Sequence, residues 1–206
     1  MKCIENCAAC CENIRRVVAG KYVNGLMLLP FEVPRLKKLG KKLGLKVEIY
    51  PQMGFGTKGR SRPRPKIIGT YQLANERCPF LRRKKCRIYR FRPLVCRSYP
   101  LSPMFGFGIE IDEMVIPFVA YGFDEKCPRV KEWNQELEKM GIKDYEPVPE
   151  EFLEKEGLME EVETKMKIQK YLDSLILKYG FVTWVFDLKT MKWQKAPKPE
   201  RIPIEI

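Results

Sequence analysis

The chain carries eight cysteines and no histidine, and this combination limits its chemistry more than any other feature of its 206 residues. Without histidine, Ser-His-Asp and Cys-His nucleophile systems, Cys₂His₂ zinc fingers and His-ligated iron are all excluded. Half of the cysteines stand within the first eleven residues, at Cys3, Cys7, Cys10 and Cys11. On a helix, these positions would share an arc of about 100°. Any site for a soft metal ion must therefore be built from cysteine thiolates.

Metal binding is the favoured interpretation of this first cysteine group, with disulfides and inert buried thiols as the alternatives. Disulfides are rare in the reducing cytosol outside hyperthermophiles, and a Lys-rich composition with 32% charged residues leaves a thermophilic origin open. The adjacent Cys10 and Cys11 would strain a single tetrahedral zinc site, because neighbouring side chains on an extended backbone point apart. The pair therefore favours a polynuclear cluster, or two sites that share this segment.

A second group of cysteines has looser spacing and comprises Cys78, Cys86, Cys96 and Cys127. Cys127 directly precedes Pro128, which places it at the predicted N-cap of a helix. The amides of a helix N-terminus stabilise a thiolate, which suits a metal ligand. An ordinary core cysteine remains the alternative for Cys127 and for Cys78.

Two motifs carry a family resemblance: the first cysteine group, and the block CPFL…CRIYRFRPLVCRSYP that spans residues 78–100. With these motifs the chain resembles the YkgJ-type cysteine-cluster family, a zinc- or iron-chelating domain whose motif is C-x-x-C-x-x-C-C. The chain has one more residue than the motif between Cys3 and Cys7. The resemblance covers residues 3–100, and Cys127 with Pro128 would supply the last ligand.

The resemblance implies a bound iron–sulfur cluster, of the 4Fe-4S type, or zinc. It also implies kinship with flagellin lysine N-methylases, which leaves an iron–sulfur oxidoreductase and an S-adenosylmethionine-dependent methyltransferase-like protein both open. The spacing of Cys3, Cys7 and Cys10 also occurs in radical S-adenosylmethionine enzymes. Against that interpretation, Ala9 occupies the usual aromatic position, and the alternating strands and helices of a barrel are missing.

Arginines and tyrosines interleave with the second cysteine group and are candidate cofactor-binding residues: Tyr89, Arg92, Arg97 and Tyr99. N–H donors directed at cluster sulfurs raise the potential of a cluster, and guanidinium charge offsets thiolate charge. Ordinary packing of a small core is the alternative role, above all for the two tyrosines.

Positive charge is concentrated in residues 1–103, which hold 24 Lys and Arg against 5 Asp and Glu in a chain of net charge +13. The excess either compensates thiolates or attracts an anionic partner. The runs Lys58–Lys66 and Arg82–Lys85 could contact phosphates, and nearby Phe55, Tyr71 and Phe91 could stack on bases. Weak nucleic-acid binding through the basic half is therefore one expectation, and a solvated charged surface is the other.

Hydrophobic periodicity predicts helices over residues 30–43, 128–140 and 151–179 and a β-hairpin over 181–193, with strands at 47–50, 66–73 and 110–123. Pro117 would confine its strand to a sheet edge or split it. Residues 54–65, rich in Gly and Pro, predict a loop, and residues 78–100 predict loops and short turns. The expected class is α+β, with a cysteine-cluster metal-binding domain at 1–130 and a helical and β-hairpin extension at 131–206 packed on it.

Neither a secretory signal nor an apolar run of about 20 residues is present, which predicts a cytoplasmic protein without membrane contact. The leading functional hypothesis is an iron–sulfur protein, with a second metal centre, for redox or group-transfer chemistry such as protein lysine methylation, acting with an unidentified protein or redox partner. The alternative is a zinc-organised module that recognises RNA or another polyanion.

Overall fold

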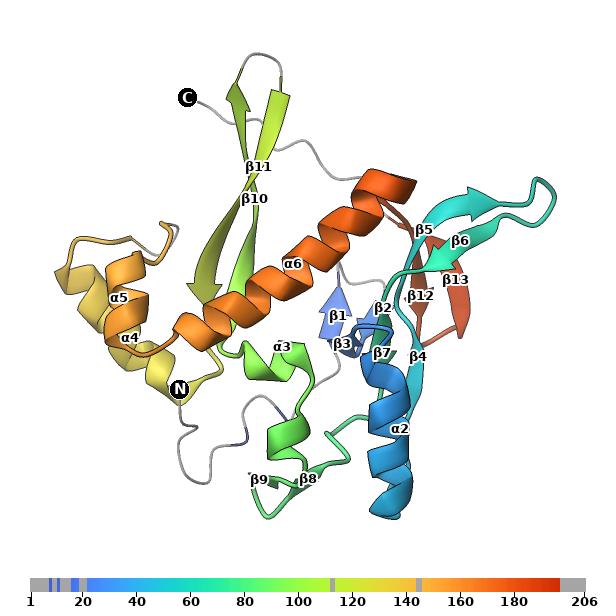
Figure 1. Ribbon diagram of the computed structural model, residues 1–206, viewed down its shortest axis with the longest axis horizontal. Helices are drawn as coiled ribbons and strands as arrows, with labels where there is room; N and C mark the ends of the chain where they lie inside the picture. The colour runs from blue at the N-terminus through green and yellow to red at the C-terminus, as the bar shows by residue number, and fades with distance from the viewer. Residues whose placement is uncertain are drawn as a thin grey trace.

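The computed structural model describes residues 8, 11, 16–18, 22–111, 114–143 and 146–196 (Figure 1). The helical elements are α2 (Glu32–Lys42), η1 (Tyr89–Phe91, a 3-10 turn), α3 (Leu94–Arg97), α4 (Pro128–Lys139), α5 (Glu150–Lys155) and α6 (Met159–Tyr179). The strands of the first half are β1 (Arg16–Val18), β2 (Tyr22–Asn24), β3 (Leu26–Leu28), β4 (Ile49–Pro51), β5 (Met53–Lys58), β6 (Arg64–Ile68), β7 (Tyr71–Leu73), β8 (Leu81–Arg82) and β9 (Lys85–Cys86). Four more follow: β10 (Leu101–Ile111), β11 (Met114–Phe123), β12 (Val182–Asp187) and β13 (Lys192–Lys195).

The strands form two small sheets and three separate hairpins, which confirms the predicted α+β class. One sheet has the order β13-β12-β5-β6 and the other the order β3-β7-β4. Within the described ranges, the pairs β1–β2, β8–β9 and β10–β11 have no third strand. The C-terminal hairpin β12–β13 is confirmed, and β12 pairs with β5, so one sheet joins residues from both ends of the sequence.

Helix α6 crosses the middle of the molecule, from α4 and α5 at one end to the β13-β12-β5-β6 sheet at the other (Figure 1). It contacts α3, β5 and β10 on its way. Buried Gln72 of β7 ties the two sheets together: its amide nitrogen donates to the carbonyl oxygens of Pro51, at 2.6 Å, and Phe186, at 3.2 Å. Its side-chain oxygen accepts from the backbone N–H of Gly25 at 2.8 Å.

Among the residues that the structure describes, two hydrophobic clusters form the core. The α2 cluster consists of Leu28, Leu36, Leu73, Phe80 and Ile88. The α4 cluster consists of Leu101, Cys127, Val130, Trp133, Leu137, Phe152, Leu153 and Leu158. Each cluster buries one face of an amphipathic helix, as the periodicity of the two helices predicts.

Helices α2 and α4 confirm the predictions for residues 30–43 and 128–140. Pro128 is the first residue of α4, and the apolar residues Val130, Trp133 and Leu137, which recur at helical spacing, are buried, while Met140 at its end is exposed. The predicted helix over 151–179 is wrong in one respect, because it is two helices. The break falls at Gly157, whose φ of 65° lies in the left-handed region that glycine adopts readily.

The loop predicted for residues 54–65 is also wrong, because most of it is the β5–β6 hairpin. Thr57 pairs with Pro65 and Lys58 with Arg64 in an antiparallel register. Strand β6 is the edge of its sheet, where a proline without an N–H is tolerated. For the same reason Pro117 fits β11, which pairs only with β10, as predicted for an edge strand.

None of the helices in the described part of the chain combines the length and the apolar composition needed to cross a bilayer.

Candidate metal centre

Five of the eight cysteines lie in the described residues, whereas Cys3, Cys7 and Cys10 lie outside them. Cys11 and Cys127 are buried, and Cys78, Cys86 and Cys96 are half-buried. Each of the five described cysteines lies at a turn, in a hairpin or at the end of a helix.

Cys11 and Cys78 belong to different cysteine groups, yet their backbones are hydrogen-bonded. The N–H of Cys78 donates to the carbonyl oxygen of Cys11 at 3.0 Å. Cys11 itself closes a turn, because its N–H donates to the carbonyl oxygen of Ala8 at 2.7 Å. The end of the first cysteine group therefore lies against the start of the second.

Cys86 is brought back towards Cys78 by the short β8–β9 hairpin, in which Leu81 pairs with Cys86. The two turn residues, Arg83 and Lys84, have φ values of 47° and 58°. Left-handed conformations at both positions characterise the tight two-residue turn whose twist matches paired strands. Cys78 and Cys86 both pack against the α2 cluster, so these two thiols share one side of the core.

Cys96 lies on the single-turn helix α3, whose N-terminus is held by a buried carboxylate. The backbone N–H of Leu94 donates to Oε1 of Glu32 at 2.8 Å, and the N–H of Leu29 donates to Oε2 at the same distance. Glu32 thus satisfies one N–H at the start of α2 and another at the start of α3. A helix as short as α3 depends on such external partners, so Glu32 positions the turn that carries Cys96.

Glu32 is almost fully buried, at 1% exposure. Burial raises the pKa of its carboxyl above the ordinary value of 4.5, against the opposing effect of the hydrogen bonds from Leu29 and Leu94. The positive charges of Arg35 and Arg97 also oppose the rise in the pKa. No sequence pattern singled out Glu32, although an acidic residue in the first turn of a helix is a typical capping signal.

The four candidate cofactor-binding residues lie along one segment, from η1 to the residues just after α3, and make different contacts. The guanidinium of Arg92 lies over the ring of Tyr89, 3.9 Å from its centroid, and Arg92 Nε donates to the carbonyl oxygen of Tyr89. Arg97 Nη2 donates to Oε1 of Glu160 on α6 at 3.0 Å, which lowers the pKa of that carboxyl. Tyr99 packs against the α4 cluster.

Cys127 occupies the N-cap of α4, as predicted, and its side chain lies in the α4 cluster. The loop before it is close to the end of the second cysteine block, because the N–H of Asp124 donates to the carbonyl oxygen of Pro100 at 2.9 Å. Cys127 is therefore in a different hydrophobic cluster from Cys78 and Cys86.

Thiols in a chain without histidine suit a soft metal or an iron–sulfur cluster, so the donor chemistry of these residues fits the group that the resemblance implies. Within the described residues, no three Cys, Asp or Glu side chains gather closely enough to hold a metal ion. Within those residues, the candidate centre consists of the contact between Cys11 and Cys78, the hairpin that carries Cys86 and the helical turn that carries Cys96.

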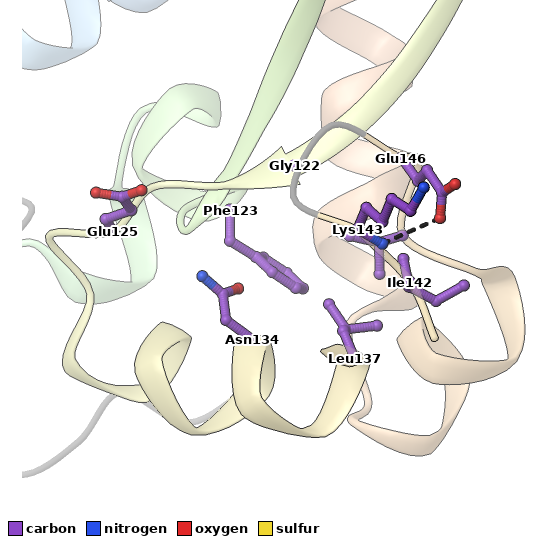
Figure 2. A pocket seen from close by; sticks show the side chains of 9 residues that line it. Gly122, Phe123, Glu125, Asn134, Leu137, Ile142, Lys143 and Glu146 are labelled. Carbon is purple, nitrogen blue, oxygen red and sulfur yellow. Dashed lines mark hydrogen bonds between the residues drawn. The ribbon is translucent and has the colours of Figure 1, made fainter. Parts of the chain in front are cut away.

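A pocket beside the loop that leads to Cys127 has a different character. It is lined by Gly122, Phe123, Glu125, Asn134, Leu137, Ile142, Lys143, Glu146 and Val148. Figure 2 shows Phe123 and Leu137 between Glu125 on one side and the hydrogen-bonded Lys143 and Glu146 on the other. These lining residues offer no thiol, and some of them, such as Phe123 and Leu137, also pack in the α4 cluster with Cys127.

Comparison with known proteins gave one match, to a family described as "CxxCxxCC: Putative zinc- or iron-chelating domain", over residues 2–118. The matched segment contains seven of the eight cysteines and ends before Cys127. No curated protein and no solved structure matches the chain.

Proposed function

Because the chain belongs to the CxxCxxCC family of zinc- or iron-chelating domains, we propose that it binds metal as an iron–sulfur cluster held by the cysteines of residues 2–118. The observation that carries this proposal is the backbone hydrogen bond from Cys78 to Cys11. It joins two cysteine groups that are 67 residues apart in the sequence, so thiols from both groups are available to one centre.

Iron–sulfur is favoured over zinc by the number and arrangement of the thiols. Adjacent Cys10 and Cys11 suit a cluster with several iron atoms better than one tetrahedral ion. Such a cluster supplies electron transfer when it is bound. The chain's own contribution is to hold the thiols, through the β8–β9 hairpin for Cys86 and through the Glu32 contacts for the Cys96 turn.

Positive side chains around the second cysteine group support the same proposal. Arg82, Arg83, Lys84 and Lys85 are exposed on the β8–β9 hairpin, directly before Cys86. Cations close to a cluster offset the negative charge of its thiolates and raise its potential. At the finer level, the proposed role is redox or group-transfer chemistry, of which protein lysine methylation is the example that the family resemblance favours.

Single cysteine variants test the proposal. When purified under nitrogen, Cys11→Ser and Cys78→Ser should each bind less iron and acid-labile sulfide than the wild type. Each variant should also lose the visible absorption of the cluster. Stability of the N-terminal half should fall with them, because metal binding there contributes to folding free energy.

Cys127→Ser makes the same chemical change at a buried thiol outside the family segment, the thiol that the resemblance offers as the last ligand. Loss of iron in this variant would add Cys127 to the ligands of residues 2–118, and a full visible spectrum would limit the ligands to that segment. Full iron content in both Cys11→Ser and Cys78→Ser would contradict the proposed ligands, and a colourless protein with stoichiometric zinc would contradict the iron–sulfur assignment.

A further inference from the structure

The β5–β6 hairpin concentrates positive charge on an exposed element. Five basic residues lie on it, all exposed: Lys58, Arg60, Arg62, Arg64 and Lys66. From Ile49 to Asn75 the sequence contains no acidic residue that could neutralise them. A projecting element with this charge attracts polyanions, and screening by dissolved salt limits the range of the attraction.

This charge is remote from Cys86 and the β8–β9 hairpin, so it does not serve that part of the second cysteine group by close contact. In Figure 1 the β5–β6 hairpin extends beyond the C-terminal end of α6, whereas β8 and β9 lie at the opposite edge of the molecule, below α3. The two basic runs of the N-terminal half therefore have different surroundings. Compensation of thiolate charge explains the Arg82–Lys85 run and leaves the Lys58–Lys66 run without a role.

A groove with aromatic walls lies beside the same hairpin, near its turn. Residues of the hairpin, of the end of α6 and of the β12–β13 hairpin line it, among them Thr57, Pro63, Phe181, Trp184 and Lys195. Phe181 is 75% exposed, which is unusual for a phenylalanine in a folded protein. The indole N–H of buried Trp184 has no hydrogen-bond acceptor within the described residues.

Tyr179, also in the wall of this groove, is flanked by cations. The ammonium groups of Lys66 and Lys178 lie 5.7 Å and 5.5 Å from the centroid of its ring. Rings next to Lys and Arg are the combination that proteins use to stack on bases while they contact the neighbouring phosphates. Phe55, which the sequence suggested for stacking, is fully buried and cannot take this role.

We propose that the β5–β6 hairpin and the groove beside it bind single-stranded nucleic acid, with the Arg and Lys side chains on phosphates and with Phe181 and Tyr179 against bases. A single strand is favoured over a duplex, because only unpaired bases expose faces on which an aromatic ring can stack. It is also favoured over an anionic membrane. The turn of the hairpin, Gly59 to Pro63, has no large apolar side chain that could enter a bilayer.

Fluorescence anisotropy with a labelled 20-nucleotide oligouridylate, measured from 50 to 200 mM salt, tests this surface. The wild type should bind in the micromolar range near physiological salt. A variant with Lys58, Arg60, Arg62 and Arg64 changed to Gln should bind at least tenfold more weakly. Its plot of log affinity against log salt should be flatter by up to about 3, for four lost phosphate contacts.

The matched control changes Arg82, Arg83, Lys84 and Lys85 to Gln, which removes the same charge from the β8–β9 hairpin. It should bind the oligonucleotide within about twofold of the wild type. Phe181→Ala should weaken binding by about 5- to 150-fold, the range of one lost stacking contact, while the salt slope stays unchanged. Circular dichroism and metal content, measured on every variant, show that the fold and the metal centre are intact.

Equal weakening by both quadruple variants would overturn the proposal, because the binding would then depend on net charge alone. Wild-type affinity in Phe181→Ala would overturn it too, since the aromatic groove would have no part in binding. Binding to vesicles of phosphatidylserine and phosphatidylcholine without binding to the oligonucleotide would assign the surface to a membrane instead.

Discussion

The buried carboxylate of Glu32 gives the sharpest test of how the fold holds the second cysteine group. In Glu32→Gln, the side chain keeps its shape but retains only one oxygen for two backbone donors, the N–H groups of Leu29 and Leu94. The amide NH₂ of Gln would face the other N–H, which is then buried without an acceptor. An unsatisfied buried donor costs about 1–3 kcal/mol.

Part of that cost is offset, because Gln avoids the burial of a charged group. We therefore expect Glu32→Gln to lower the free energy of unfolding by about 1–2 kcal/mol at neutral pH. At a urea m value of about 2 kcal/mol/M, the midpoint of unfolding falls by about 0.5–1 M. Urea titration followed by circular dichroism measures this shift.

Glu160→Gln is the matched control, because it makes the same chemical change at an exposed carboxylate that contacts Arg97 of α3. Exposed ion pairs contribute about 0–1 kcal/mol, so this variant should unfold close to the wild-type midpoint. An effect in Glu160→Gln as large as in Glu32→Gln, or a wild-type midpoint in Glu32→Gln, would refute the reasoning.

The pH dependence of the same variant has a definite sign. Burial raises the pKa of Glu32 above 4.5, so the folded protein binds this proton more tightly than the unfolded chain does. The stability that this protonation contributes is complete below about pH 4.5 and is lost as the pH rises through the raised pKa. The difference in unfolding free energy between wild type and Glu32→Gln should therefore be larger at pH 4.5 than at pH 8, and the opposite trend would contradict the assignment.

Two further substitutions test other parts of the fold. Gly25→Ala should lower the free energy of unfolding by about 1–3 kcal/mol in urea titration, because the added Cβ would meet the backbone carbonyl of Leu73. An unchanged midpoint of unfolding would contradict this, because it would mean that the backbone can move away from the added Cβ without loss of stability. Asp187→Asn should destabilise the protein by about 1–3 kcal/mol at neutral pH, because the carboxylate accepts hydrogen bonds from Thr190, Gln194 and the backbone of Lys189. Burial alone would raise the pKa of Asp187, but these contacts outweigh it and lower the pKa below 3.8. The extra unfolding free energy of the wild type over Asp187→Asn should therefore persist above pH 3.8 and be lost as the pH falls through the lowered pKa. An advantage that grew on acidification would contradict this.

Local patterns predicted those elements whose stability comes from one amphipathic face. The Leu repeat of α2, the Val130, Trp133 and Leu137 stripe of α4 and the C-terminal hairpin are all present at nearly the predicted positions. The N-cap position of Cys127 followed from Pro128 alone. These features depend on neighbours within a few residues, which a sequence displays directly.

Features that depend on distant partners could not be predicted in this way. The β5–β6 hairpin exists because β12, more than a hundred residues later, pairs with β5, and this pairing overrides the weak strand propensity of its glycines and prolines. The structural role of Glu32 comes from its hydrogen bond with the N–H of Leu94, and that of Cys11 from its backbone hydrogen bond with Cys78. The cysteine spacing indicates that thiols are used together, but it does not indicate which of them meet.

The central claim is tested most directly by counting iron, acid-labile sulfide and zinc in the wild-type protein purified under nitrogen. One cluster of the 4Fe-4S type predicts about four iron and four sulfide ions per chain, with zinc well below one. The preparation should be brown and should lose its colour on oxidation by air. Stoichiometric zinc without iron or sulfide would contradict the proposed function and would leave the cysteines as a zinc site.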